Sequence, residues 1–165
     1  MKIKDKIAPC LWFDTQAEEA ANYYVSIFPN SKILKIARYG KAGHDQHQKP
    51  EGQVMTVQFE LNGQTFTALN GGPIFKFSEA VSLQVYVDDQ KELDYYWDKL
   101  RAGGDPKAQV CGWLKDKYGL SWQVAPGFMV DWFGEPNEKS ERAMAAMVKM
   151  SKLDIAALEK AYYGK

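Results

Sequence analysis

The side chains in this sequence with the widest chemical repertoire are two histidines and two cysteines. His44 and His47 stand three residues apart in H-D-Q-H, a spacing that could hold a metal ion on one helical turn. Their loop is polar and flanked by glycines, so two solvent-exposed histidines are the competing interpretation. Cys10 could act as a nucleophile or redox thiol, but no histidine or other base stands beside it, and free cysteines usually serve as small packing residues.

A second chemical feature is the stretch Cys111–Gly127, C-G-W-L-K-D-K-Y-G-L-S-W-Q-V-A-P-G, which predicts a β-hairpin with a charged turn. Its second arm, 120–125, alternates apolar residues with small or polar ones, so one face should pack and the other should be polar. Such a polar face either lines a cavity or faces water. Asp116, between two lysines, is either a charged lip of a pocket or a hydrated hairpin end.

Composition and charge limit the classes of function. The 165 residues are 45% hydrophobic and 25% charged, as is typical of a soluble globular protein. Lysine and arginine number 21, as do aspartate and glutamate, so no net charge attracts nucleic acid or an anionic membrane. No apolar run has the length of a signal peptide or a membrane span, and two cysteines fit reduced thiols better than a disulfide framework. We expect a cytoplasmic protein without nucleic-acid or membrane partners.

The elements that must position these groups follow a repeated order. In the first half we expect a strand at 7–13, a helix at 15–27 and strands at 31–39, 53–61 and 64–69. Thr15 and Glu18 have the spacing of a capping box at the start of the helix. In the second half we expect a strand at 81–87, a helix to residue 100 and strands at 107–114 and 120–125, with Asp88-Asp89 and Glu92 capping the helix.

The two halves also share residue patterns, because Asp14–Glu18 matches Asp88–Glu92 and 63–67 matches 119–123. A repeat of two units predicts two fused modules. The expected fold class is therefore α+β, with two βαβββ modules at 5–70 and 80–127 inside a domain of residues 1–135. A C-terminal helical extension at 136–165 should follow, with amphipathic helices that either cover an apolar surface or take part in a dimer contact.

The alignment of the two halves predicts a ligand site. Its polar side chains would face one concavity and orient a small polar ligand, or they are simply satisfied groups inside a barrel. The polar candidates are Thr67, Ser82, Gln84 and Gln123. Aromatic rings would form the walls and could stack on a flat ligand, although most rings in a small domain belong to the core. The aromatic candidates are Trp12, Tyr86, Trp113 and Trp122, and strand parity places Cys10 on the same face.

Several motifs resemble one known group of proteins. They are W-F-D-T-Q-A-E-E-A-A-N-Y-Y, L-N-G-G-P, D-Y-Y-W-D-K-L, the hairpin motif and K-L-D-I-A-A-L-E-K-A-Y. Together they cover nearly the whole chain and resemble the vicinal-oxygen-chelate superfamily of glyoxalase, bleomycin-resistance and extradiol-dioxygenase proteins. Within it they resemble the PhnB-like family named 3-demethylubiquinone-9 3-methyltransferase. The resemblance implies a pair of glyoxalase-like half-barrels with a ligand or metal in the concave face, and a homodimer in which a partner covers exposed strand edges.

The resemblance also implies where a metal would bind. Metalloenzymes of the superfamily take His and Glu ligands from the first and last strands of each module. Those places fall near Ala8 or Pro9, near Thr67, at Ser82 and at Gln123. None of these residues offers an imidazole, a carboxylate or a thiolate.

The family name implies a methyltransferase, which would ordinarily show a glycine-rich turn between a strand and a helix. Gly71-Gly72-Pro73 instead precedes a loop and a strand. We therefore expect no metal and no other cofactor, and a protein that binds an unidentified small molecule without assigned catalysis. The alternative is an enzyme of the superfamily, either a metal-dependent lyase, isomerase or dioxygenase, or the methyltransferase of the family name.

Overall fold

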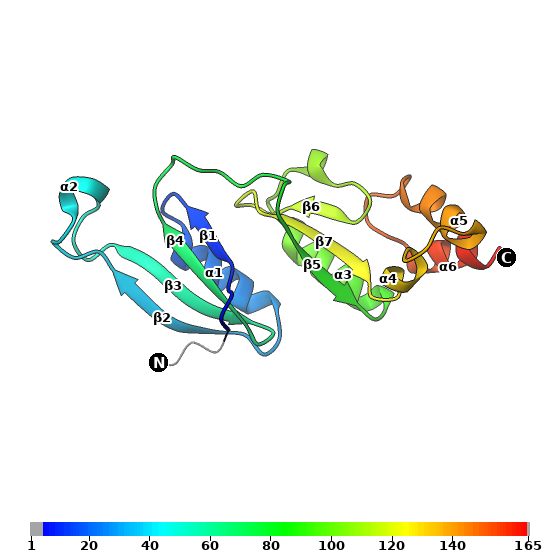
Figure 1. The fold of residues 1–165 in the computed structure, drawn as a ribbon, viewed down its shortest axis with the longest axis horizontal. Helices are drawn as coiled ribbons and strands as arrows, with labels where there is room; N and C mark the ends of the chain where they lie inside the picture. Colours follow the sequence, from blue (N-terminus) through cyan, green and yellow to red (C-terminus); the bar gives the residue numbers. More distant parts are fainter. Residues whose placement is uncertain (1–4, 165) are drawn as a thin grey trace. The chain divides into compact units, whose positions relative to one another are not determined.

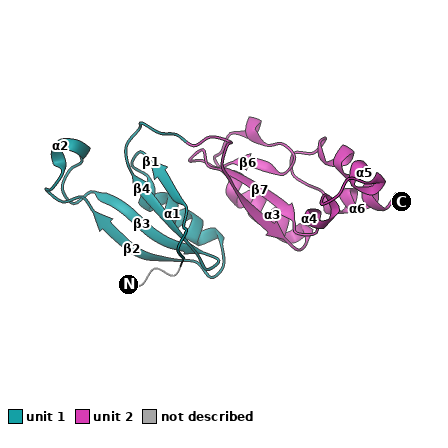
Figure 2. Cartoon of the chain, in the orientation of Figure 1, with its two compact units in different colours: residues 1–76 teal, residues 77–165 magenta. Residues whose placement is uncertain are grey.

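The computed structural model describes residues 5–164. These residues form two compact units divided between Lys76 and Phe77 (Figure 2). Residues 1–4 of the expected domain at 1–135 and residue 165 of the expected C-terminal extension lie outside the described residues. The expected modules at 5–70 and 80–127 fall in different units, and the C-terminal helices belong to the second unit. None of the helices in the described part of the chain combines the length and apolar composition that a membrane crossing requires.

The first unit is a four-stranded sheet with one helix on one face (Figure 1). Its strand order is β1 (Cys10–Phe13), β4 (Gln64–Asn70), β3 (Val54–Leu61) and β2 (Lys32–Arg38). β1 runs parallel to β4, and the other pairs are antiparallel. Alternate residues such as Phe59 and Phe66 are buried towards α1 (Ala17–Ile27), whose buried stripe includes Tyr24. The predicted β-α-β-β-β order is confirmed here.

The start of α1 differs from the prediction. The N-cap residue is Gln16, which makes no side-chain cap, so the capping box expected at Thr15 is wrong. The side chain of Asn70 replaces it from the end of β4: Oδ1 accepts the Ala17 N–H at 2.8 Å while Nδ2 donates to the Val54 carbonyl at 3.0 Å. Because both bonds are buried, the cap also ties the helix to the sheet.

The second unit has a three-stranded sheet in the order β5 (Ser82–Val87), β7 (Ser121–Pro126) and β6 (Trp113–Lys115). β5 runs parallel to β7, and β6 runs antiparallel to it. α3 (Gln90–Arg101) packs on one face through Leu93, Trp97 and Leu100 (Figure 1). The predicted cap is confirmed, since Asp89 accepts the Glu92 N–H and the Glu92 carboxylate accepts the Asp88 N–H.

One expected strand of the second module is mostly absent. Residues 107–114 were expected to be extended, but Pro106–Ala108 is a 3-10 turn, η1, and β6 begins only at Trp113. The proline fixes φ and lacks an N–H, and the Asp105 carboxylate accepts the Lys107 N–H to close the turn. Further along, the amides of Cys111 and Gly112 donate to the carbonyls of Met150 and Ser151, so they are not available for a ladder. β6 keeps only the end of this expected strand, and the second module has three strands in the order β-α-β-β, one strand fewer than the expected βαβββ.

The C-terminal helices are α4 (Met129–Trp132), α5 (Glu138–Met147) and α6 (Ile155–Tyr163). α5 and α6 lie side by side (Figure 1), and the connection between them docks on the second unit. Gln90 of α3 donates to the Leu153 carbonyl and accepts the Ile155 N–H. Leu153 and Leu158 are buried, so this part covers an apolar surface, one of the two expected roles.

Candidate functional site

The face of the second sheet opposite α3 carries a row of polar side chains. Residues paired across strands share a face, and the register pairs Gln84 with Gln123 and Ser82 with Ser121. Trp113 of β6 also pairs with Gln123 and therefore belongs to this face. Ser82, Gln123 and Trp113 are partly exposed, and Gln84 is exposed. We call this surface the open face of the second sheet.

Hydrogen bonds connect four side chains on the open face into a chain. The Tyr86 hydroxyl donates to Gln84 Oε1 at 2.9 Å, and Gln84 Nε2 donates to Gln123 Oε1 at 3.4 Å. Gln123 Nε2 then donates to Ser82 Oγ at 2.8 Å. Since Ser82 accepts in this chain, its own O–H remains able to donate. The amides are thus held in fixed orientations on an accessible surface.

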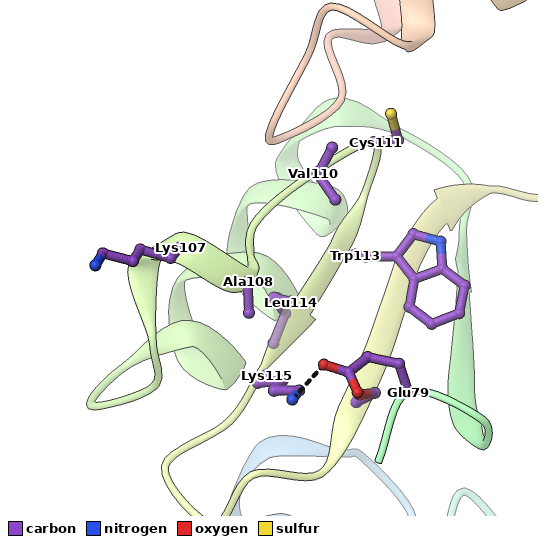
Figure 3. A pocket seen from close by; sticks show the side chains of 9 residues that line it. Glu79, Lys107, Ala108, Val110, Cys111, Trp113, Leu114 and Lys115 are labelled. Carbon is purple, nitrogen blue, oxygen red and sulfur yellow. Dashed lines mark ion pairs between the residues drawn. The ribbon is translucent and has the colours of Figure 1, made fainter.

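Trp113 and Ser121 of the open face also line a cavity of about 420 Å³ (Figure 3). Its volume falls within the range of roughly 300–1,000 Å³ found for small-molecule sites. The wall combines apolar groups with a few charged and polar ones, including Glu79, Val110, Trp113, Leu114, Lys115 and Ser121. β6 and β7 therefore supply both the aromatic wall and the polar groups of one pocket.

Ser121 is the unusual member of this wall. The residue is 1% exposed, and its hydroxyl oxygen has no hydrogen-bond partner among the described residues. Buried hydroxyl groups nearly always form a hydrogen bond, because a buried hydroxyl without a partner loses its hydrogen bonds to water and gains none from the protein. The pairing of Ser121 with Lys115 across β7 and β6 places the two side chains next to each other on the open face.

An ion pair closes one side of the cavity. Lys115 Nζ contacts a carboxylate oxygen of Glu79 (Figure 3). The Lys115 side chain is 25% exposed and that of Glu79 is 67% exposed, so the lysine belongs to the wall and the glutamate to the rim. The hydrogen bond from Lys115 and its positive charge lower the pKa of Glu79, which keeps the carboxylate ionised.

The structure places five of the predicted site residues on the open face, namely Ser82, Gln84, Tyr86, Trp113 and Gln123. Trp122 was expected in the same wall, and that expectation is wrong. It follows Ser121 on β7 and therefore points to the opposite face, where it is 2% exposed. Its indole N–H donates to Asp116 Oδ2 at 2.8 Å.

Asp116 fits neither of its two expected roles. It is 2% exposed, so it is neither a pocket lip nor a hydrated turn. Its carboxylate accepts the backbone N–H groups of Tyr118 and Leu120, at 2.8 and 3.1 Å, together with the indole N–H of Trp122. The neighbouring Lys117 is exposed. Asp116 therefore holds the hairpin turn and anchors the core tryptophan.

The remaining predicted site residues, Cys10, Trp12 and Thr67, lie in the first unit. Cys10 pairs with Thr67 in the register of β1 and β4, so both belong to the face of the sheet opposite α1. Trp12 fixes the turn after β4, since its indole N–H donates to the Gly72 carbonyl at 2.8 Å. Its ring also packs so closely on Gly71 that a Cβ there would lie 2.1 Å from Trp12 Cζ2. A common concavity with the second sheet remains a prediction.

The thiol of Cys10 has no feature of an activated nucleophile. Burial raises the pKa of Cys10, because partial loss of hydration disfavours the thiolate. Reactive cysteines show the opposite shift. Cys10 and Cys111 are both free thiols.

The two histidines lie in α2 (His44–His47), a single helical turn in the loop between β2 and β3. The His47 ring packs on Tyr39 with centroids 4.6 Å apart. Its Nδ1 accepts the Lys49 N–H at 2.9 Å, so Nε2 carries the proton and faces the Ala42 carbonyl at 3.3 Å. With both ring nitrogens engaged, His47 supports the loop and is not set up as a metal ligand.

The residues present fit neither a metal nor the cofactor of a methyltransferase. The positions corresponding to the superfamily's ligands carry Thr67, Ser82 and Gln123, whose neutral oxygens bind divalent ions weakly. Within residues 5–164, no group of three or more His, Cys, Asp or Glu side chains is placed to hold a metal ion. Gly71 and Gly72 follow β4, but the chain then runs irregularly to β5, so no helix begins at this turn.

Sequence reasoning missed Glu79, Lys115 and Ser121 as members of the site. The alternation in 120–125 predicts that Ser121 lies on the polar face of its strand, but whether its hydroxyl is bonded depends on packing that a sequence does not show. The charged turn of the hairpin predicts a solvated Lys115. Glu79 lies in the irregular segment before β5, where no periodicity indicates which way a side chain points.

Comparisons with known proteins agree with this fold. A model of the 3-demethylubiquinone-9 3-methyltransferase family matches residues 5–125. A "putative 3-demethylubiquinone-9 3-methyltransferase, PhnB protein" from Bacillus cereus is 38% identical, covering 73% of this chain and 98% of its own, with a TM-score of 0.61. A Staphylococcus aureus protein is 34% identical over 76% of this chain and 98% of its own, with a TM-score of 0.33.

A Pseudomonas aeruginosa protein shares the fold at 18% identity and a TM-score of 0.56, covering 74% of this chain and 98% of its own. No curated protein matches the chain.

Proposed function

We propose that this chain, which belongs to the 3-demethylubiquinone-9 3-methyltransferase family, binds a small molecule. The site is the open face of the second sheet together with the adjoining cavity. The observation that carries this proposal is the buried hydroxyl of Ser121, which lines a cavity of ligand size and has no hydrogen-bond partner within residues 5–164.

The polar row supports the same proposal. The bonds among Gln84, Gln123 and Ser82 orient amide and hydroxyl groups on an accessible surface, where they can recognise a polar ligand without large rearrangement. Trp113 offers an apolar ring beside them. We assign no catalytic step to the site, since neither a metal-binding set of residues nor an activated nucleophile accompanies the polar row.

Two further features complete the proposal. We place the protein in the cytoplasm, in keeping with its two free thiols.

We also propose a homodimer, because β1 and β5 each form the edge of a sheet and edges of this kind are commonly covered by a partner. Val81, just before β5, is 67% exposed and would lie at such a contact.

A thermal-shift screen with aromatic and phosphonate-like compounds tests the proposed function. Compounds that bind should raise the melting temperature of the wild-type protein, and Gln123→Ala should reduce that rise because it removes the central amide of the row. Gln64→Ala is the matched control, since Gln64 is an exposed residue at the start of β4 in the first unit. Stabilisation that is equal in all three proteins would contradict the site.

A further inference from the structure

Two lysines line the cavity of the second unit, and one of them, Lys115, forms an ion pair whose two side chains differ in exposure. Lys115 lies largely within the wall, whereas its partner Glu79 is mostly in water and belongs to the irregular segment between β4 and β5. Figure 3 shows the Lys107 side chain pointing away from this pair. An exposed ion pair contributes little to stability, so the Glu79 carboxylate can move into solvent at small cost, while Lys115 stays in place.

The Ser121 hydroxyl lies beside this exchangeable position. It pairs directly with Lys115 across the two strands, is fully buried and has no partner among residues 5–164. A hydroxyl with no acceptor and a lysine with a replaceable carboxylate together match one chemical group, an anion with two oxygens. The rest of the wall, including Val110, Trp113 and Leu114, is apolar and would contact the body of the ligand.

We propose that the cavity binds compounds in which a carboxylate is attached to a flat apolar body. The ligand carboxylate takes the place of the Glu79 carboxylate on Lys115 and accepts the Ser121 O–H, while the ring system lies against Trp113. In the free protein the Glu79 carboxylate therefore occupies the position of the ligand carboxylate on Lys115, and it weakens the binding of competing anions. This inference rests on the proposed function and specifies the class of ligand.

Calorimetric titration with 2-naphthoate and its neutral analogue 2-naphthamide tests the inference, since the two share one apolar body. Wild-type protein should bind the carboxylate at least fivefold more tightly than the amide. Lys115→Met should weaken naphthoate about tenfold and leave naphthamide unchanged, because only the former interacts through its charge. Glu79→Gln should strengthen naphthoate two- to fivefold by removing the competing anion. Lys117→Met, on the exposed side of the same hairpin, is the matched control and should change neither affinity.

Ser121→Ala separates a binding role from a structural one. It should weaken naphthoate several-fold without lowering the melting temperature, because the lost hydroxyl makes no bond in the free protein. Equal affinities for the two compounds, or naphthoate binding that Lys115→Met leaves intact, would overturn the carboxylate assignment alone. The same holds if naphthoate does not bind while other compounds in the thermal-shift screen do so in a Gln123-dependent way. If no compound in the screen binds in a Gln123-dependent way, the result would contradict the proposed function as well.

Discussion

Asp116 and Ser121 stand five residues apart in one hairpin, and both are buried polar groups with opposite bonding states. The Asp116 carboxylate accepts three donors, whereas the Ser121 hydroxyl has no partner among the described residues. A fully bonded buried group contributes to folding, while an unmet group costs stability until something bonds to it. This contrast assigns Asp116 to the fold and Ser121 to the proposed site.

Replacing Asp116 should therefore destabilise the protein strongly. Asp116→Ala leaves two backbone amides and the Trp122 indole without their acceptor, so we expect a loss of about 3 kcal/mol in the free energy of unfolding. Urea denaturation followed by tryptophan fluorescence measures it. Asp98→Ala is the control, because Asp98 is exposed and its ion pair with Arg101 lies within one helix turn, and it should cost less than about 0.5 kcal/mol. Equal losses in the two variants would refute the anchoring role of Asp116.

Cys10 should react slowly with alkylating reagents at neutral pH. Cys10 is an exposed residue, but partial burial of its thiol raises the pKa, so the native thiol holds its proton more tightly than an unperturbed cysteine and less thiolate is present. In a Cys111→Ala background, the rate of iodoacetamide modification should keep increasing with pH beyond the ordinary thiol pKa. Denatured protein, treated in parallel, should react faster at neutral pH. A rate that is already maximal near pH 7 would indicate an activated thiol.

At the scale of elements, periodicity predicted most of the fold because it reports which face of a strand or helix is buried. The alternation in 53–61 and in 120–125 corresponds to the buried faces of β3 and β7, and the apolar stripe of α1 was found as expected. The errors arose where distant contacts decide local structure. The cap of α1 comes from Asn70, more than fifty residues away, and the amides of Cys111 and Gly112 bond to the C-terminal segment.

The candidate site was predictable to the same extent. Strand parity places Ser82, Gln84 and Gln123 on one face, as found, whereas Trp122, expected in the same aromatic wall, lies on the other face with Leu83 and Leu114. Whether a polar side chain such as Ser121 is bonded, and which loop residue reaches Lys115, depends on three-dimensional packing. Those two facts now define the proposed ligand, and neither follows from residue spacing.

The docking of the C-terminal helices on α3 should depend on acid pH. Lys152 Nζ lies 2.7 Å from Asp94 Oδ1, and the hydrogen bonds from Lys152 and Gln90 lower the pKa of Asp94. A lowered native pKa means that the stabilisation is present above the ordinary carboxyl pKa and is lost as the pH falls through the lowered value. The pair is exposed, so the effect should stay below about 1 kcal/mol.

Urea denaturation of wild-type protein and Asp94→Asn at several pH values measures this dependence. The two proteins should differ near pH 7 and converge in acid, where Asp94 becomes protonated. Asp98→Asn, on the same helix and paired there with Arg101, serves as the control for a general change in charge. A difference that grows as the pH falls would have the wrong sign for the interaction described.

At the scale of the whole molecule, the proposed homodimer predicts a sedimentation mass of twice the 18.7 kDa of the chain. Because Val81 is exposed next to the edge strand β5, Val81→Lys should shift the equilibrium towards monomer in analytical ultracentrifugation. Val130→Lys changes another exposed valine, on α4, and should leave the mass unchanged. A mass of one chain at every concentration tested would contradict the dimer and leave the ligand site unaffected.

The most direct test of small-molecule binding is a two-dimensional ¹H–¹⁵N NMR titration with the tightest compound from the thermal-shift screen. We predict that the shift changes concentrate on the open face of the second sheet, at the amides of Ser82, Gln84, Ser121 and Gln123 and the indole N–H of Trp113. Exposed residues of α5 and its C-cap, such as Met144 and Val148, should not change. Saturable changes confined to α5 or to the first unit, with the open face silent, would contradict the proposed site.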